Sequence, residues 1–221
     1  MNFKVTALVL LYCTTLVAIT VEPSATLLEN DQVKVIRALE MPNVKGGFHK
    51  HKLNRVMIYL QDGQQRFEYE DGRQPEVFDW KAGEVKWSKA DGMHSPEVIN
   101  SDAFNIIEIE LKKAGLRRAI TSTRDPVKID PKHYKVEFEN DQVRVLRVKI
   151  EAHGTVPMHQ HSVNRVTVFL TDQYFRVKDS QGRVETMKHK AGAAVWGTPA
   201  IHAEENLSDH PFEVLAIELK S

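Results

Sequence analysis

The sequence predicts an all-β protein built from two tandem jelly-roll barrels, and three observations lead to this fold class. The chain of 221 residues contains an internal duplication. Its apolar residues alternate with a period of two over short segments, as expected of strands that bury one face. Turn signals that contain glycine separate these segments at short intervals, which is typical of β-sandwiches and barrels.

The duplication has a period of about 110 residues, an ordinary size for a domain. The segment ENDQV occurs at residues 29–33 and again at residues 139–143, and IELK closes both copies at residues 109–112 and 217–220. Such a unit is too long for a solenoid or propeller repeat. The chain is therefore interpreted as a duplicated domain.

Within each copy the strands are expected to be short. Val56, Ile58 and Leu60 share one face of a strand, and residues 166–170 repeat this alternation. The turn signals between strands are Asp62-Gly63, Asp71-Gly72, Ala82-Gly83, Asp91-Gly92, Gln181-Gly182 and Ala191-Gly192. No window has a convincing helical period, so a jelly roll fits each unit best.

Four segments follow from these boundaries. Residues 1–25 are expected to be a signal peptide, residues 26–112 the N-terminal barrel, residues 113–133 a linker and residues 134–221 the C-terminal barrel. The linker is rich in Lys, Arg, Thr and Pro. A short helix at residues 114–119 is only weakly indicated, because no capping residue supports it.

The N-terminal segment has the layout of a secretory signal, with Lys4 before an uncharged run at residues 5–21. We expect cleavage between Ala18 and Ala25, a periplasmic or secreted protein, and no membrane contact after removal of the signal. The alternative is an uncleaved anchor, although the run is slightly short for a membrane-spanning helix. Cys13, the only cysteine, lies in this run.

Charge and motifs exclude several classes of function. Thirty Lys and Arg residues balance thirty Asp and Glu residues, and they are interspersed. Because no basic stripe could follow a phosphate backbone, nucleic acid is not an expected partner. No P-loop, dinucleotide or nucleophile-elbow motif occurs. A small-molecule ligand is the expected partner, and exposed barrel edges make a homodimer a reasonable expectation.

The histidines are part of the duplication and predict a metal site in each copy. Two histidines at positions i and i+2 of a strand point to the same face, and a third follows about 40 residues later. The two groups are His49, His51 and His94, and His159, His161 and His202. Three imidazoles suit a divalent transition metal such as Fe, Zn, Mn, Ni or Cu. The alternative is that these are ordinary hydrogen-bonded strand histidines.

The remaining histidines fall in turns or outside the register of the repeat. We expect them to be solvated; they are His133, His153, His189 and His210.

The pattern resembles the cupin superfamily, and specifically a bicupin. Gly154 precedes the second histidine pair, Gly192 and Pro199 precede His202, and Asn206 follows it with the cupin spacing. The flanking sequence is similar to small cupins of β-alanine degradation. The resemblance implies cupin barrels over residues 28–112 and 138–220. The first copy has no glycine four or five residues before His49, so the second copy is the better candidate site.

The chain departs from the cupin pattern where that pattern places a metal-binding glutamate. Arg55 and Arg165 occupy this position, on the same inward face as the histidines. Arginine cannot ligate a cation, so this position supplies no carboxylate ligand, and we expect sites of three histidines without glutamate.

Three readings of these arginines remain open. They could orient an anionic substrate beside a metal, bind a carboxylate in a metal-free pocket, or pair with a glutamate of another strand. The glutamates in reach would be Glu108, Glu204 or Glu205.

We therefore interpret the chain as an exported bicupin that binds a divalent metal and a small carboxylate. Arg55, Arg165, Asn206 and Trp196 are the candidate substrate-binding residues, although a tryptophan on such a strand usually belongs to the core. If the protein is an enzyme, a metal-dependent dioxygenase, isomerase or lyase is expected. The alternative is a non-catalytic ligand-binding module without metal.

Overall fold

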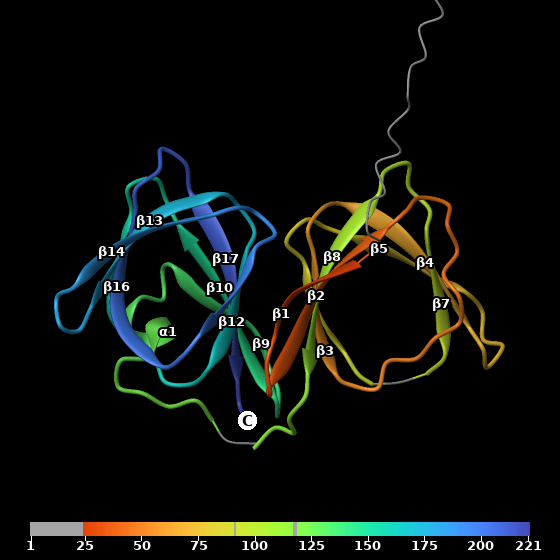
Figure 1. Ribbon diagram of the computed structural model, residues 1–221, viewed down its shortest axis with the longest axis horizontal. Coiled ribbons are helices and arrows are strands. Elements are labelled where there is room, and N and C mark those ends of the chain that lie inside the picture. The colour runs from red at the N-terminus through yellow and green to blue at the C-terminus, as the bar shows by residue number, and fades with distance from the viewer. Residues whose placement is uncertain (1–23, 91, 117–118) are drawn as a thin grey trace, which may run out of the picture.

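A computed structural model describes residues 24–90, 92–116 and 119–221, so residues 1–23 of the predicted signal peptide lie outside it. The described chain forms two barrels that lie side by side, joined by the connection after the eighth strand (Figure 1). Within the described ranges no helix is long and apolar enough to cross a membrane.

The N-terminal barrel consists of two antiparallel sheets. Its strands are β1 (Ser24–Glu29), β2 (Val33–Glu40), β3 (Arg55–Tyr59), β4 (Gly63–Tyr69), β5 (Glu76–Trp80), β6 (Val85–Ser88), β7 (His94–Val98) and β8 (Phe104–Leu111). One sheet has the order β1-β2-β8-β3-β6 and the other the order β5-β4-β7. Ser24 and Ala25, which the sequence assigned to the signal peptide, pair with β2.

The C-terminal barrel repeats this arrangement. Its elements are α1 (Pro126–Ile129), β9 (Tyr134–Glu139), β10 (Val143–Ile150), β11 (Thr155–His161), β12 (Arg165–Phe169), β13 (Gln173–Asp179), β14 (Val184–His189), β15 (Ala194–Gly197), β16 (Ala200–Asn206) and β17 (Phe212–Leu219). The sheet orders are β9-β10-β17-β12-β15 and β11-β16-β13-β14. The prediction of an all-β protein with two jelly-roll barrels is confirmed.

The two copies differ at the strand that carries the histidine pair. In the C-terminal barrel this segment is β11, which pairs with β16. In the N-terminal barrel the corresponding residues form only isolated bridges, one of which joins His49 to His94. The first site therefore lies on a less regular backbone.

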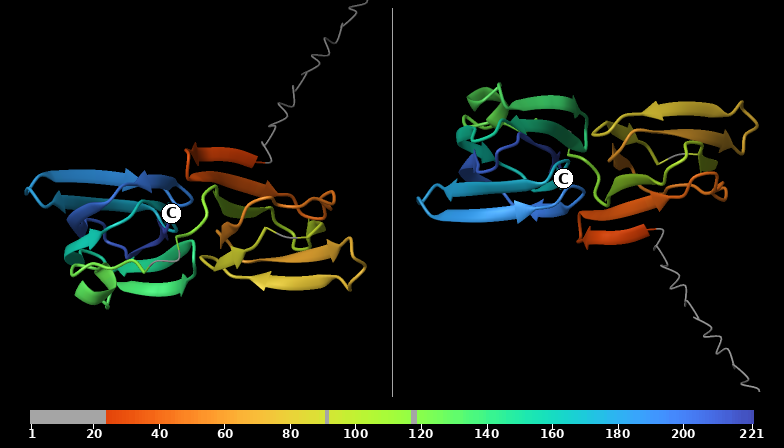
Figure 2. Two further views of the ribbon diagram at one scale, coloured as in Figure 1. Left: turned by 90° about the horizontal axis from the view of Figure 1, so that it is seen from below. Right: turned by 90° about the horizontal axis from the view of Figure 1, so that it is seen from above.

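The largest apolar cluster lies between the barrels. Val56 and Ile58 of β3 face Val166 and Val168 of β12 in one cluster, and all four side chains are fully buried. The five-stranded sheets of the two barrels are therefore packed face to face, as the three views indicate (Figures 1 and 2). The opposite face of each sheet lines a separate barrel interior.

The interface has approximate twofold symmetry. Asn54 donates from Nδ2 to Gln142, and the equivalent Asn164 donates to Gln32 across the same interface. Gly83 has a φ of +80°, and a Cβ there would lie 3.3 Å from Cδ1 of Leu170 in the other barrel. Equivalent contacts from both copies are what an isologous interface provides.

The predicted linker is partly built into the C-terminal barrel. The described residues 114–116 and 119 are not helical; the helix is α1, and Asp125 caps it by accepting from the backbone of Val127. The backbone amide of Gln160 in β11 donates to Arg124 at 2.8 Å. The expectation that His133 is solvated is wrong, because this residue is 7% exposed and its Nδ1 donates to Asp130 at 2.6 Å.

The shared cluster predicts that both barrels unfold together. Replacing Ile109, a fully buried residue of this cluster, by alanine is expected to lower the free energy of unfolding by about 2–5 kcal/mol. Urea denaturation followed by tryptophan fluorescence and circular dichroism would measure this change. Two separate transitions, of which the variant shifts only one, would contradict the shared core.

Candidate functional site

The structure brings each predicted histidine triad together. His49, His51 and His94 offer nitrogen atoms within 4.8 Å of one another, and so do His159, His161 and His202. The reason is local: His159 and His161 share a face of β11, and His202 lies opposite His159 on β16. Both groups therefore have a geometry that can hold one metal ion.

The C-terminal triad is the more buried and the more fixed. His159, His161 and His202 are 0%, 3% and 7% exposed, whereas His49 is exposed. Nδ1 of His159 donates to the carbonyl of Pro157 at 3.0 Å, and Nδ1 of His161 donates to Glu218 at 2.8 Å. These bonds leave Nε2 of both rings as the nitrogen that could bind a metal, as partners of the second nitrogen usually do.

The protonation state of the triad also suits a metal. Burial lowers the pKa of His161 well below its ordinary value, and the charge of Arg165 lowers it further. Burial is also the main reason that the pKa of His202 falls to about 4. Nε2 of His202 is buried without a hydrogen-bond partner. A neutral, unpartnered imidazole nitrogen is costly to bury unless a cation binds it, so these residues fit a metal ion.

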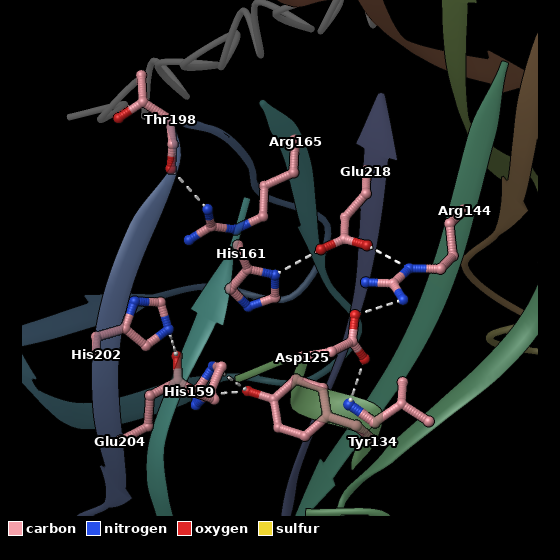
Figure 3. A network of polar contacts seen from close by, with 11 residues as sticks. Asp125, Tyr134, Arg144, His159, His161, Arg165, Thr198, His202, Glu204 and Glu218 are labelled. Atoms are coloured by element: carbon pink, nitrogen blue, oxygen red, sulfur yellow. Dashed lines mark hydrogen bonds and ion pairs between the residues drawn. The ribbon is translucent and has the colours of Figure 1, made fainter. Parts of the chain in front are cut away.

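A network of buried charged side chains contacts Nδ1 of His161 (Figure 3). Glu218, fully buried in β17, accepts from His161 with one oxygen and from Nε of Arg144 at 2.6 Å with the other. Arg144 also donates to Asp125 at 2.7 Å. Asp125 thus both caps α1 and, through Arg144 and Glu218, helps to hold His161 in place. This network was not predicted from the sequence. The glutamate that recurs in both IELK segments, Glu218 in the second copy, was a signal for it.

Tyr134 and Glu204 are further residues of the site that the metal-site prediction did not include. The hydroxyl of Tyr134 lies 3.1 Å from Nε2 of His159 and 3.1 Å from Oε2 of Glu204. Oε1 of Glu204 lies 3.5 Å from Nε2 of His202. Burial raises the pKa of Glu204, but the interactions with the surrounding histidines and the hydrogen bond from Tyr134 outweigh burial and lower this pKa below its ordinary value.

The two arginines have different environments. Arg55 is 5% exposed and donates to Glu108 at 2.7 Å and to Ser88 at 3.0 Å, as the structural reading predicts. Arg165 donates to the carbonyl of Thr198 at 2.9 Å and has no ion-pair partner among the described carboxylates. The residue of β17 equivalent to Glu108 is Ala216. The second copy has therefore lost the partner that neutralises the first arginine.

Each barrel contains a cavity beside its triad. The N-terminal cavity is about 590 Å³ and has an aromatic wall that includes Tyr59, Phe78 and Trp80. The C-terminal cavity is about 220 Å³, and His161, His202, Arg165 and Glu204 line it together with apolar residues. Arg165 therefore shares one small cavity with two histidines of the buried triad, His161 and His202.

The structure gives Asn206 a different role from the expected substrate contact. Its buried side chain donates to the carbonyls of Glu151 and His210, which fixes the loop after β16, and it does not line the C-terminal cavity. Trp196 borders the cavity and also packs against the core between the barrels.

His189 was also expected to be solvated. It is half-buried and stacks on Phe169 with ring centroids 4.2 Å apart, so that expectation is wrong. His153 and His210 are exposed, as predicted.

The buried network of charged side chains predicts that substitution of Asp125 strongly lowers the stability of the protein. Replacing Asp125 by alanine leaves Arg144 with one carboxylate and removes the cap of α1, so the free energy of unfolding should fall by about 3–5 kcal/mol. Chemical denaturation would measure this loss. The matched control is Asp172→Ala, which removes an exposed ion pair with Lys190 in the same barrel and should have a much smaller effect. Equal losses would contradict the assignment.

Comparisons with known proteins identify the fold. No protein-family model matches the sequence, and no curated protein matches it. The structure is similar to that of AerE from Microcystis aeruginosa, with 14% identity, 87% of this chain and 89% of that chain covered, and a TM-score of 0.63. It is also similar to oxalate decarboxylase of Bacillus subtilis, a protein with Mn(II) centres, with 14% identity, 88% and 71% covered, and a TM-score of 0.61. The chain therefore has the bicupin fold, two cupin barrels in tandem, and its two histidine triads fit a metal-binding cupin.

Proposed function

We propose that the C-terminal barrel binds a divalent transition metal and, beside it, a small carboxylate that Arg165 recognises. The observation that carries this proposal is the different environment of the two arginines. Arg55 is neutralised by Glu108, whereas Arg165 lines a cavity together with His161 and His202 and has no ion-pair partner among the described residues. A guanidinium matches a carboxylate in shape and charge.

Different residues would bind the metal and the carboxylate. His159, His161 and His202 would hold the metal, which supplies a positive centre able to polarise a bound carboxylate. Glu218 and Pro157 keep two of these rings in one orientation. Thr198 fixes one nitrogen of Arg165, so the other guanidinium nitrogens are available to an anion.

The size and wall of the cavity limit the ligand. A volume of about 220 Å³ lies below the range of drug-sized ligand pockets, so a carboxylate of only a few carbon atoms is expected. Phe169, Phe175 and Met187 give this cavity an apolar wall. An apolar wall strengthens the attraction between a carboxylate and the two positive centres.

Oxalate decarboxylase, one of the structural neighbours, acts on such a small acid. Turnover by this chain would be of the dioxygenase, isomerase or lyase type. The alternative is a metal-free binding module, in which Arg165 and neutral imidazoles hold the anion alone. Export to the periplasm or medium is part of the proposal, and it rests on the N-terminal segment at residues 1–25.

The proposal predicts that Arg165→Met weakens carboxylate binding. Calorimetric titration of oxalate into Mn²⁺-loaded protein should give a dissociation constant at least about tenfold higher for this variant than for the parent chain, since a charge-assisted bond contributes about 1.5–3 kcal/mol. The uncharged analogue oxamide should bind both proteins weakly. Treatment with a chelator should abolish binding if the metal takes part, and leave it intact if the protein is a metal-free module.

The matched control is Arg55→Met in the other barrel. This substitution leaves Glu108 unpaired in a half-buried position, so it should lower the melting temperature and leave the oxalate affinity of the C-terminal site unchanged. Equal affinity in the parent and Arg165→Met proteins would contradict a carboxylate contact at Arg165.

A further inference from the structure

The C-terminal site contains a carboxylate that the cupin pattern does not place there. Glu204 follows His202 by two residues on β16, so both side chains point to the same face of the strand. One carboxylate oxygen is 3.5 Å from Nε2 of His202. The other is 3.1 Å from the hydroxyl of Tyr134, which is itself 3.1 Å from Nε2 of His159. The carboxylate thus lies beside the metal-facing nitrogens of two histidines.

The distance between Glu204 and His202, 3.5 Å, is slightly longer than that between two ligands of one ion. Donor atoms about 2.1 Å from a metal are about 3.0 Å apart at an octahedral angle and about 3.4 Å apart at a tetrahedral one. Nε2 of His202 makes no hydrogen bond, so the 3.5 Å approach of the glutamate oxygen is not explained by one. A shared cation explains why an unpartnered nitrogen and a carboxylate oxygen face each other.

Charge supports the same role. The guanidinium of Arg165 lowers the affinity of this cavity for any cation, because like charges repel at short distance. A carboxylate next to the triad offsets that repulsion. In the N-terminal barrel Glu108 does so by pairing with Arg55, and the positions equivalent to Glu204 and Tyr134 are Pro96 and Ser24.

We propose that Glu204 is a fourth metal-binding side chain of the C-terminal site, and that the two barrels therefore hold unequal metal sites. The C-terminal site has three histidines and a carboxylate from β16, supported by Tyr134. The N-terminal site has three histidines alone. This inference rests on the metal binding in the proposed function and is independent of the carboxylate ligand.

The test measures metal affinity in a chain with only the C-terminal site. His49→Ala/His51→Ala removes the first triad at weakly buried positions and serves as the parent. Competition for Zn²⁺ against a chromophoric chelator should then show a dissociation constant at least about tenfold higher in Glu204→Gln than in the parent. Glutamine can still accept the bond from Tyr134, so the fold is expected to persist, and circular dichroism checks this.

Two further variants distinguish metal ligation by Glu204 from an effect of its charge alone and from a non-specific effect of substitution on β16. Glu204→Asp keeps the charge but withdraws the carboxylate by one methylene, so it should also lose affinity, and the visible spectrum of the Co²⁺ protein should change. Glu205→Gln alters a partly exposed neighbour that pairs with Arg176, and should match the parent.

The outcomes distinguish this proposal from the proposed function. Parent-like Zn²⁺ affinity in Glu204→Gln or Glu204→Asp would overturn the ligand role of Glu204. No Zn²⁺ binding by the parent would overturn both this proposal and the metal part of the function. Tight Zn²⁺ binding that depends on Glu204, together with no oxalate binding, would overturn only the carboxylate ligand.

Discussion

Burial of both faces of the five-stranded sheets is the constraint on which the rest of the structure depends. One face of each sheet packs on the other barrel, through side chains such as Ile58 and Val168, and the opposite face lines the interior. Because strand residues alternate, the register that buries the apolar face also fixes which residues face the cavity. Arg55 and Arg165 face inward because Val56 and Val166 face the interface.

This constraint allows the interiors to diverge while the interface stays symmetrical. The paired contacts of Asn54 and Asn164 are retained in both copies. Inside the barrels, the two cavities differ in volume, in aromatic content and in the neutralisation of the arginine. Conservation of the fold and diversification of the sites therefore occur on opposite faces of the same strands.

The sequence was sufficient to predict the fold and the clustering of the histidines into two triads, because both follow from periodicity and duplication. The H-x-H pair and a later third histidine recur in both copies, and period-two alternation determines which residues share a face. The metal-site prediction did not include Glu204, because the search for a carboxylate ended at the arginine positions that the cupin pattern specifies.

The contacts by which the predicted linker helps to hold His161 could not be predicted in the same way. Asp125 lies in a segment without periodicity, and its partner Arg144 comes from a strand whose register is known only after folding. His133 appeared solvated for the same reason, since Asp130, which accepts from it, belongs to the same irregular segment. Contacts between irregular segments and strands depend on tertiary packing, which local patterns do not encode.

The symmetrical interface has a consequence for how the two pockets could become different. In a homodimer assembled through such an interface, every substitution appears in both subunits, so a change that suits one pocket is imposed on the other. Joining both halves in one polypeptide removes that coupling. Glu108 can then remain paired with Arg55 while its counterpart is Ala216, and a single chain can combine a neutralised arginine with Arg165, which has no ion-pair partner among the described residues. Covalent fusion thus gives this molecule an asymmetry that identical subunits could not encode.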